Sequence, residues 1–224
     1  MKKIVFILIF LFCGFIYSEG WVFKDNFSDE ESLENWYIEK WAARDIDVEI
    51  EDDMLQITNE NNKSANMDVK CVVKKEKIEN FTLEVETKVL EIKREEVDAK
   101  GQGRFCGAIW VHFDCSELYT RWGEGILAGI GIDEYNTKID APFKWDVVLV
   151  KKDEKKKTAL EIDPTKNWVK MKLVVKGDEI LLYINDELQI KQKWERKSGY
   201  VGLRVYAYNL FMKCAFKNFN ISVQ

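Results

Sequence analysis

The feature that most constrains the fold is an alternation of apolar and polar residues with a period of two, which recurs along most of the chain. Segments 46–50, 67–73, 81–89 and 169–175 each place apolar side chains at every second position. Successive side chains of an extended strand point to opposite faces of a sheet. Each segment therefore predicts a strand with one face toward a core and the other toward water.

Short turn sequences separate these segments. Lys176-Gly177-Asp178 and Asn185-Asp186 stand between apolar runs, as expected for hairpin loops. Both prolines, Pro142 and Pro164, fall between strand candidates. Only the stretch 29–36 favours a helical turn. About a dozen antiparallel strands with almost no helix predict an all-β protein, either a two-sheet sandwich or a barrel.

The first twenty residues have the pattern of a secretory signal peptide. Lys2 and Lys3 precede an apolar run over 4–16, which is too short to span a bilayer, and small residues frame a cleavage site at 18–20. The alternatives are a lipid anchor on Cys13 and an uncleaved anchor. We expect export to the periplasm, cell surface or medium, with residues 1–20 as signal peptide. Residues 21–224 then form a single domain without a transmembrane segment.

Composition excludes several classes of protein. Hydrophobic residues make up 46% of the chain, which is enough for a full core and excludes disorder. The net charge is −5 with both signs interspersed, so there is no basic surface for nucleic acid. The lysine-rich segment 151–157 is interpreted as a solvated hairpin tip, and contact with an anionic surface is the alternative.

Four cysteines remain after removal of the signal peptide: Cys71, Cys106, Cys115 and Cys214. An even number in an exported protein permits two disulfides. If 104–115 is one strand, Cys106 and Cys115 lie about 30 Å apart at ~3.3 Å per residue, too far to be bonded. Their partners are then Cys71 or Cys214, or the thiols are free, since cysteines in strands are often buried apolar groups.

The polar faces of the predicted strands differ in character. On 81–89 and 168–175 this face is mainly Glu, Lys and Thr, which is typical of a solvated surface. On 104–114 and 200–208 it carries aromatic, His, Arg and Asp side chains. Aromatic rings can stack on the C–H face of a sugar, and the polar groups supply directional hydrogen bonds. The candidate ligand-binding residues are Trp110, His112, Asp114, Tyr119, Arg121, Arg204 and Tyr206.

Structural roles are the alternative for these residues. Trp110 and Tyr206 could be core or loop-covered residues, because aromatic side chains are mostly buried. His112 is the only histidine, and one ring makes neither a metal site nor a catalytic triad. Asp114 could orient it, but no Ser or Cys nucleophile stands beside the pair.

Several segments resemble the concanavalin A-like lectin/glucanase superfamily, especially laminin-G-like jelly rolls and secreted keto-sugar glycoside hydrolase domains. The segments that carry the resemblance are 24–29, 54–57, 168–178, 182–187, 199–204 and 216–219. The resemblance implies a jelly-roll sandwich of two curved antiparallel sheets, with ligands on the concave one. Such a fold does not fix an activity.

Two departures from this superfamily bear on function. Its family-16 glucanases carry the pattern Glu-x-Asp-x-x-Glu on one strand, whereas segment 84–88 here has only Glu84 and Glu86 and ends in Lys88. Retaining glycosidases need two carboxyl groups about 5–5.5 Å apart. Related domains often bind a structural calcium through an acidic residue in the last strand, where this chain has Lys217. An ammonium group repels a cation, so we expect no cofactor and no calcium, although Asp25 remains available.

Three functions are consistent with these observations. The leading hypothesis is a non-catalytic, lectin-like domain whose partner is a glycan or polysaccharide. The second is a glycoside hydrolase that acts through acids such as Asp114, Glu117 or Glu124. The third is an envelope or surface interaction protein that has kept the fold and lost sugar binding.

Overall fold

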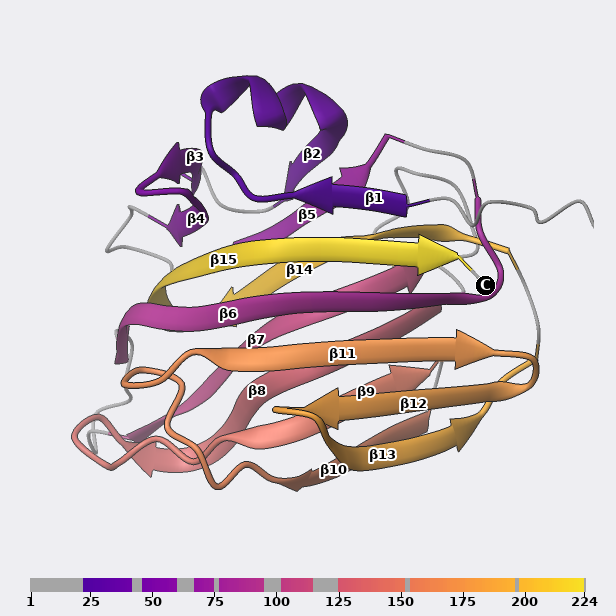
Figure 1. Ribbon diagram of the computed structural model, residues 1–224. Coiled ribbons are helices and arrows are strands. Elements are labelled where there is room, and N and C mark those ends of the chain that lie inside the picture. The colour runs from indigo at the N-terminus through magenta and orange to yellow at the C-terminus, as the bar shows by residue number, and fades with distance from the viewer. Residues whose placement is uncertain are drawn as a thin grey trace, which may run out of the picture.

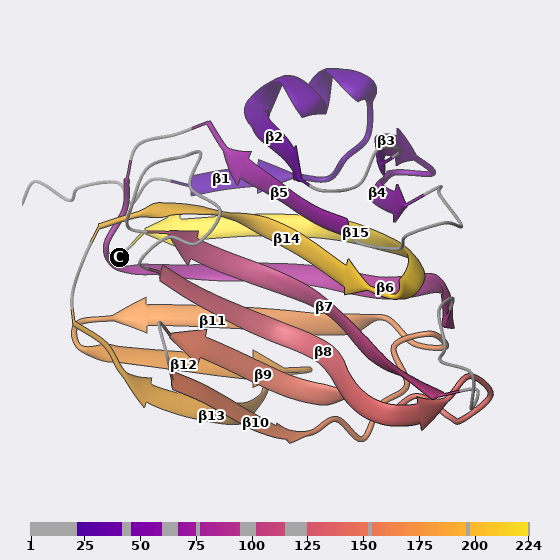
Figure 2. The same ribbon diagram turned by 180° about the vertical axis from the view of Figure 1, so that it is seen from behind.

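The computed structural model describes residues 22–41, 46–59, 67–74, 77–94, 102–114, 125–151, 154–195 and 198–223. In these residues the strands form two antiparallel sheets that pack face to face, as Figures 1 and 2 show from opposite sides. The predicted all-β jelly-roll sandwich is therefore confirmed. The predicted signal peptide lies outside the described residues. Within them, no helix has the length and apolar character needed to cross a membrane.

The first sheet has eight strands and contains the C-terminal strand. Its spatial order is β13 (Glu187–Lys193), β12 (Glu179–Ile184), β11 (Val169–Lys176), β6 (Phe81–Arg94), β15 (Leu210–Val223), β4 (Met54–Asn59) and β3 (Ile46–Glu51), and β1 (Val22–Asp25) also pairs with β15. The two longest members, β6 and β15, lie side by side at its centre (Figure 1). Their pairing joins the last strand to one from the first half of the chain.

The second sheet has seven strands. Its spatial order is β10 (Glu154–Ala159), β9 (Asp146–Lys151), β8 (Gly125–Lys138), β7 (Gln102–Asp114), β14 (Tyr200–Tyr208), β5 (Met67–Val73) and β2 (Trp36–Trp41). β7 lies between β8 and β14, so that Ile109 is opposite both Ile130 and Val205. This register places the apolar positions of three strands on one face, where they are buried in the core.

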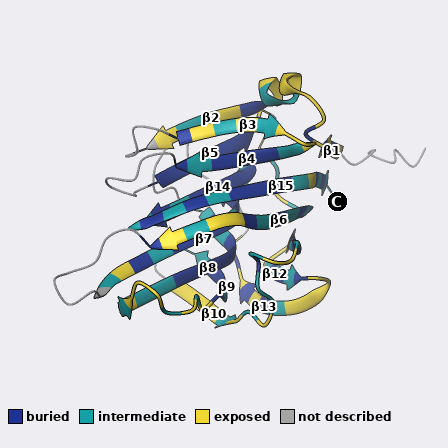
Figure 3. Cartoon of the chain, turned by 90° about the vertical axis from the view of Figure 1, so that its left-hand side faces the viewer, coloured by how far each residue is buried: buried dark blue, intermediate teal, exposed yellow. Residues whose placement is uncertain are grey.

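The core fills the space between the sheets. The alternate residues Phe81, Leu83 and Val85 of β6 are buried, and Phe105 and Phe113 of β7 are buried from the other side. The ring centroids of Phe81 and Phe113 are 5.0 Å apart, which joins the two layers. In Figure 3 dark blue follows the inner positions, while the edge strand β13 shows exposed yellow segments. Hydrophobic burial between two such faces is the main stabilising contribution to a sandwich.

The predicted turns are present. Asn185 and Asp186 have φ values of 49° and 68°, and Gly177 has a φ of 59°. Left-handed residues of this kind form the tight hairpins that match the twist of antiparallel strands. The predicted helical turn is the 3-10 helix η1 (Glu30–Asn35), whose first turn is capped by Asp29.

The strand β5 differs from the prediction. The alternation in 67–73 predicts one face exposed to water, but all seven residues are buried. The reason lies in the polar positions of this strand, because Asp68 forms a buried ion pair with Arg204 of β14. Alternation alone does not distinguish a charge that faces water from a charge that faces a buried partner.

The described cysteines are not bonded. Cys71, Cys106 and Cys214 are free thiols, which decides between the two alternatives left by the sequence, and Cys115 lies outside the described residues. Burial raises the pKa of Cys71 to about 12 and also raises that of Cys214. Burial and the nearby Asp133 raise the pKa of Cys106 to about 11.

These pKa shifts predict the chemical reactivity of the two fully buried thiols. Only the thiolate reacts with alkylating agents, and at pH 8 both groups are protonated and shielded from solvent. We expect iodoacetamide to label Cys71 and Cys214 only after denaturation, as measured by mass spectrometry of digested peptides. Rapid labelling of either thiol in the native protein would show that these strands are open to solvent.

Candidate functional site

The sequence-predicted site lies on the outer face of the seven-stranded sheet. Trp110 of β7 is opposite Arg204 of β14, and Tyr206 is two residues further along β14 on the same face. On the far side of β14, β5 places Lys70 opposite Arg204 and Asp68 opposite Tyr206. Directly opposed residues of antiparallel strands share a face of the sheet. We call this surface the Trp110 face, and it consists of Trp110, His112, Arg204, Tyr206, Asp68 and Lys70.

Two parallel aromatic rings form the open part of the Trp110 face. The ring centroids of Trp110 and Tyr206 are 6.3 Å apart and the ring planes differ by 12°. Both residues are partly exposed. The indole Nε1 of Trp110 is buried and has no hydrogen-bond partner in the described part of the chain. The Tyr206 phenol is protonated at neutral pH and can donate a hydrogen bond, and burial raises its pKa further.

A buried ion pair lies beside these rings. Arg204 donates from Nε to Oδ1 of Asp68 and from Nη2 to Oδ2, each at 2.8 Å. The two side chains are 5% and 2% exposed. The guanidinium carbon of Arg204 lies 5.9 Å from the Trp110 ring centroid. Arg204 is therefore held by a bidentate carboxylate and supports the indole from the side, rather than pointing into solvent.

His112 belongs to the same buried layer. It is only 2% exposed and lies opposite Gly202 of β14. A Cβ atom at Gly202 would be 2.1 Å from the carbonyl oxygen of Cys71 and 2.9 Å from Nε2 of His112. Only glycine allows this close approach of β14 to β5 and to the imidazole. The histidine ring is thus packed against a backbone that leaves it little room to move.

The structure brings together four of the seven sequence-predicted residues: Trp110, His112, Arg204 and Tyr206. Tyr119 and Arg121 lie outside the described residues, as does the side chain of Asp114, whose backbone pairs with Tyr200 at the end of β7. Sequence reasoning missed Asp68 and Lys70, which are both buried on the Trp110 face. The available signal was their position at alternate residues of an otherwise apolar strand.

The acidic pair that resembles the glucanase motif lies on the other sheet. Glu84 of β6 is 3.2 Å from Nζ of Lys172 and 3.6 Å from Nζ of Lys170. Glu86 is 3.3 Å from Nζ of Lys217. These carboxylates are neutralised by lysines on the eight-stranded sheet, away from the Trp110 face.

The two positions that bear on calcium have protein partners. Oδ1 of Asp25 accepts a hydrogen bond from the Phe27 amide, and Oδ2 accepts one from Nε1 of Trp36, both at 2.8 Å. Lys217 contacts Glu86 and lies 4.1 Å from the ring centroid of Trp168. Calcium needs six to eight oxygen ligands, and the oxygens of Asp25 are already engaged.

We therefore expect calcium to leave the melting temperature of the protein unchanged. An ion that binds only the folded state must raise the melting temperature through mass action. Differential scanning calorimetry in millimolar calcium and in EDTA checks this expectation. A rise of several degrees with calcium would mean that other oxygen atoms complete a site.

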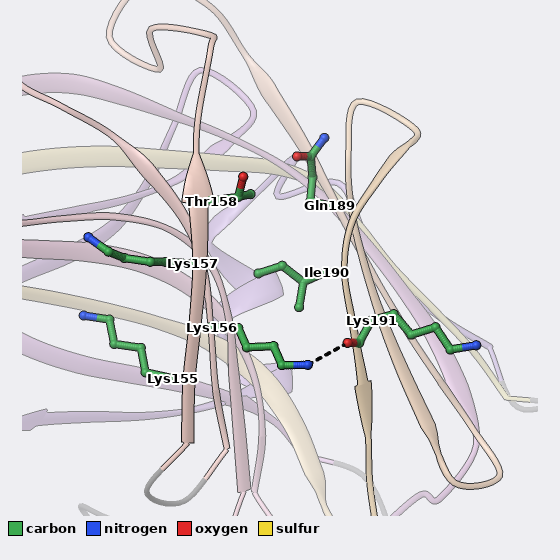
Figure 4. A pocket seen from close by; sticks show the side chains of 7 residues that line it. All are labelled: Lys155, Lys156, Lys157, Thr158, Gln189, Ile190 and Lys191. Atoms are coloured by element: carbon green, nitrogen blue, oxygen red, sulfur yellow. Dashed lines mark hydrogen bonds between the residues drawn. The ribbon is translucent and has the colours of Figure 1, made fainter.

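A separate groove of about 520 Å³ lies where β10 and β13 approach each other at the edge of the sandwich. It is lined by Lys155, Lys156, Lys157, Thr158, Gln189, Ile190 and Lys191. Nζ of Lys156 donates to the carbonyl oxygen of Lys191 at 3.1 Å, whereas Lys155 and Lys157 point to the other side of β10 (Figure 4). Residues 154–157 are exposed, as predicted for a solvated segment, but they belong to the edge strand β10 rather than to a hairpin tip, and residues 152–153 lie outside the described residues. Lys156 thus crosses the groove and donates to a backbone carbonyl of the edge strand β13. This carbonyl would otherwise be open to pairing with another strand.

Comparison with known proteins shows the family to which this chain belongs. The family model described as the 3-keto-alpha-glucoside-1,2-lyase-like domain matches residues 22–222. The chain belongs to this family. The predicted membership of the concanavalin A-like lectin/glucanase superfamily is confirmed. A search of curated proteins found no sequence match.

Solved structures share the fold at low sequence identity. A Bacillus subtilis protein of unknown function with a galectin-like fold has 13% identity and a TM-score of 0.58, with 90% of this chain and 96% of that one covered. The catalytic domain of a laminarinase from Thermotoga petrophila has 11% identity, coverage of 89% and 96%, and a TM-score of 0.57. The carbohydrate-binding module CBM66 from Bacillus subtilis has 17% identity, coverage of 84% and 95%, and a TM-score of 0.50. The fold is thus common to carbohydrate-binding and glycoside-cleaving proteins.

Proposed function

We propose that this protein binds a glycan on the Trp110 face and does not cleave it. The observation that carries the proposal is the pair of parallel, partly exposed rings of Trp110 and Tyr206 on a sheet face. Such rings offer flat apolar area to the C–H face of a sugar. A carbohydrate-binding module of similar fold supports this assignment.

Polar groups around the rings can orient the sugar. The Tyr206 hydroxyl is protonated at neutral pH and can donate a hydrogen bond to a sugar oxygen. Arg204, which is held by its bidentate contact with Asp68, lies beside the Trp110 ring and restricts its position. A rigid aromatic pair loses little conformational freedom when the ligand binds, and this favours affinity.

Binding without cleavage is supported by the state of the carboxylates. Glycosidases generally use two carboxyl groups that flank the scissile bond. Asp68, on the Trp110 face, is bonded through both oxygens to Arg204. Glu84 and Glu86 lie on the other sheet in ion pairs with lysines. None of these three is placed as a free acid beside the two rings.

The proposal predicts the effect of removing the indole. Trp110→Ala should weaken glycan binding by about 1–3 kcal/mol, the scale of losing an anchor residue at an interface. It should cost little stability, because a partly exposed ring leaves no closed cavity. The measurements are a glycan-array screen, calorimetric titration of the best ligand and thermal unfolding.

Trp168→Ala is the matched control for this experiment. Trp168 is also partly exposed, but it lies beside Lys217 on the eight-stranded sheet. Its removal should leave glycan affinity unchanged. Equal losses in both variants, or full binding by Trp110→Ala, would place the glycan elsewhere.

The family description favours a second function, an elimination reaction on an oxidised glucoside. A lyase acting between C1 and C2 of a 3-keto glucoside removes the C2 proton, which the adjacent ketone acidifies, and expels the C1 substituent. One general base suffices for this step, because the proton that it takes from C2 can be passed to the leaving oxygen, and a histidine is suited to it at neutral pH. His112 lies next to Trp110 on the same face, although its 2% exposure limits contact with a substrate.

Turnover of a 3-keto glucoside tests the second function. Methyl 3-keto-α-glucoside is incubated with the protein, and methanol release is measured. Under the lyase proposal the wild type releases methanol and His112→Gln does not. Glycan binding without any release of methanol supports the non-catalytic proposal.

The cellular location is part of the same proposal. The signal-like pattern of residues 1–20 supports export, which would give the single domain 21–224 access to extracytoplasmic polysaccharides. Detection of the cleaved chain outside the cytoplasm, by fractionation and N-terminal sequencing, tests it.

A further inference from the structure

Beyond Tyr206 the outer face of the seven-stranded sheet continues to an arginine that lies between two tyrosine rings. The guanidinium carbon of Arg104 is 4.6 Å from the ring centroid of Tyr135 and 5.8 Å from that of Tyr208. The strand register shifts between Gly103 and Phe105, so that β8 has an extra residue opposite Arg104. Such an irregularity redirects a side chain at the end of a strand. The two rings confine the Arg104 side chain, which is nonetheless 51% exposed.

This arginine has one long ion-pair contact with a described carboxylate. Within the described residues the nearest carboxylate oxygen, Oδ1 of Asp133, is 3.8 Å from Nη2 of Arg104. The other oxygen of Asp133 accepts a hydrogen bond from Nζ of Lys155 at 3.1 Å. Two cations therefore share one carboxylate, which leaves a net charge of +1. No acceptor in the described part of the chain takes a hydrogen bond from the Arg104 guanidinium.

This cluster is continuous with the Trp110 face. Arg204, Tyr206 and Tyr208 occupy alternate positions of β14 and so share one face of the sheet. Tyr208 lies opposite Cys106 of β7, which is two residues from Arg104. Trp110 and Arg104 are six residues apart on β7, about 20 Å at ~3.4 Å per residue. A ligand that contacts both must be a chain of several sugar units.

We propose that Arg104, with Tyr135 and Tyr208, forms a subsite for the anionic group of an acidic oligosaccharide whose other units lie on Trp110 and Tyr206. The inference rests on the proposed glycan binding. The planar guanidinium matches the oxygens of a uronate carboxylate or a sulfate ester through two parallel hydrogen bonds. The flanking rings already restrict the side chain, so that little freedom is lost on binding.

A glycan array that holds neutral, uronate and sulfated oligosaccharides tests the subsite with the full mature chain. We expect the wild type to retain an acidic oligosaccharide more tightly than its neutral counterpart. Tetragalacturonate and its methyl ester form one matched pair, and a sulfated and a desulfated chondroitin tetrasaccharide form the other. The pair whose acidic member binds more tightly than its neutral member shows whether the recognised group is a carboxylate or a sulfate ester.

Variants of Arg104 connect the response to this residue. Arg104→Gln should lower the affinity for the acidic member about tenfold, as expected for the loss of hydrogen bonds to a charged group, and leave the neutral member unchanged. Arg104→Lys should retain only part of the affinity, since an ammonium cannot form two parallel bonds. Lys24→Gln removes the same charge from an exposed position of β1 and should change nothing.

The outcomes separate this subsite from the proposed function. Preference for neutral glycans, or unchanged binding of the acidic member by Arg104→Gln, overturns the subsite. If Trp110→Ala still weakens binding in that case, glycan binding on the Trp110 face stands. Loss of acidic binding in Arg104→Gln but not in Trp110→Ala overturns the proposal as stated, because the other sugar units then do not lie on Trp110. Absence of binding to every glycan overturns both.

Discussion

Replacing Asp68 by alanine is expected to destabilise the protein by about 3–5 kcal/mol, the usual effect of removing one partner of a buried ion pair. Asp68 accepts two hydrogen bonds of 2.8 Å from Arg204, and both side chains are almost fully buried. The variant leaves the guanidinium buried without the Asp68 carboxylate. Chemical denaturation monitored by circular dichroism measures the loss.

Two further variants show whether the effect comes from the pair. Asp47→Ala removes a carboxylate from an exposed position of β3 and should change stability by less than about 0.5 kcal/mol. The double variant Asp68→Ala with Arg204→Met removes both charges, so its destabilisation should be smaller than the sum of the two single effects. Strict additivity would show that the two side chains do not stabilise each other.

Asp68→Ala also links stability to the proposed site. Arg204 lies 5.9 Å from the Trp110 ring and is positioned by Asp68. Under conditions in which Asp68→Ala remains folded, the indole should be less well fixed and glycan affinity should fall. Trp110→Ala, in contrast, should affect binding and leave stability nearly unchanged. The two variants therefore separate the residue that contacts sugar from the pair that orients it.

Much of the fold could be predicted because it depends on local patterns. The alternation in 81–89 predicts β6, and the pair Asn185-Asp186 adopts the left-handed conformation of a tight hairpin. Both features are set by neighbouring residues. The pairing of β14 with β5 joins residues more than 130 positions apart, as in the Arg204–Asp68 contact. Nothing near Asp68 in the sequence indicates that its partner is an arginine.

The candidate site could likewise be predicted only where it depends on the pattern within one strand. Trp110 and Tyr206 were identified because each lies on the polar side of its own strand, and the register of β7 with β14 brings their rings together. The burial of His112 depends instead on Gly202 in the neighbouring strand, which lets the backbone approach the imidazole. Exposure on a sheet face is a property of several strands at once. The pattern of one strand predicts the face to which a side chain points, but not whether residues of other strands bury it.

The second large effect is expected for Arg94→Met, which should also cost about 3–5 kcal/mol as one partner of a buried ion pair is lost. Arg94, at the end of β6, donates from Nη2 to Oε2 of Glu134 at 2.6 Å, and the two side chains are 1% and 10% exposed. Its Nη1 donates to the carbonyl oxygens of Ile139 and Ala141 at 3.2 and 2.5 Å. Glu134 belongs to β8, so that this one side chain joins the two sheets and the connection that follows β8.

Methionine is unbranched and apolar and can pack on Phe143, but it loses the cation–π contact with this ring, whose centroid is 4.0 Å from the guanidinium carbon of Arg94. What the variant loses is the charge and the hydrogen bonds, while Glu134 stays buried. At roughly 2–4 °C per kcal/mol for a domain of this size, the melting temperature should fall by about 10 °C. Lys93→Met is the matched control, because the neighbouring side chain is exposed and its loss should shift the melting temperature by no more than about 2 °C. A similar melting temperature for both variants would show that the hydrogen bonds of Arg94 to Glu134, Ile139 and Ala141 do not contribute to stability.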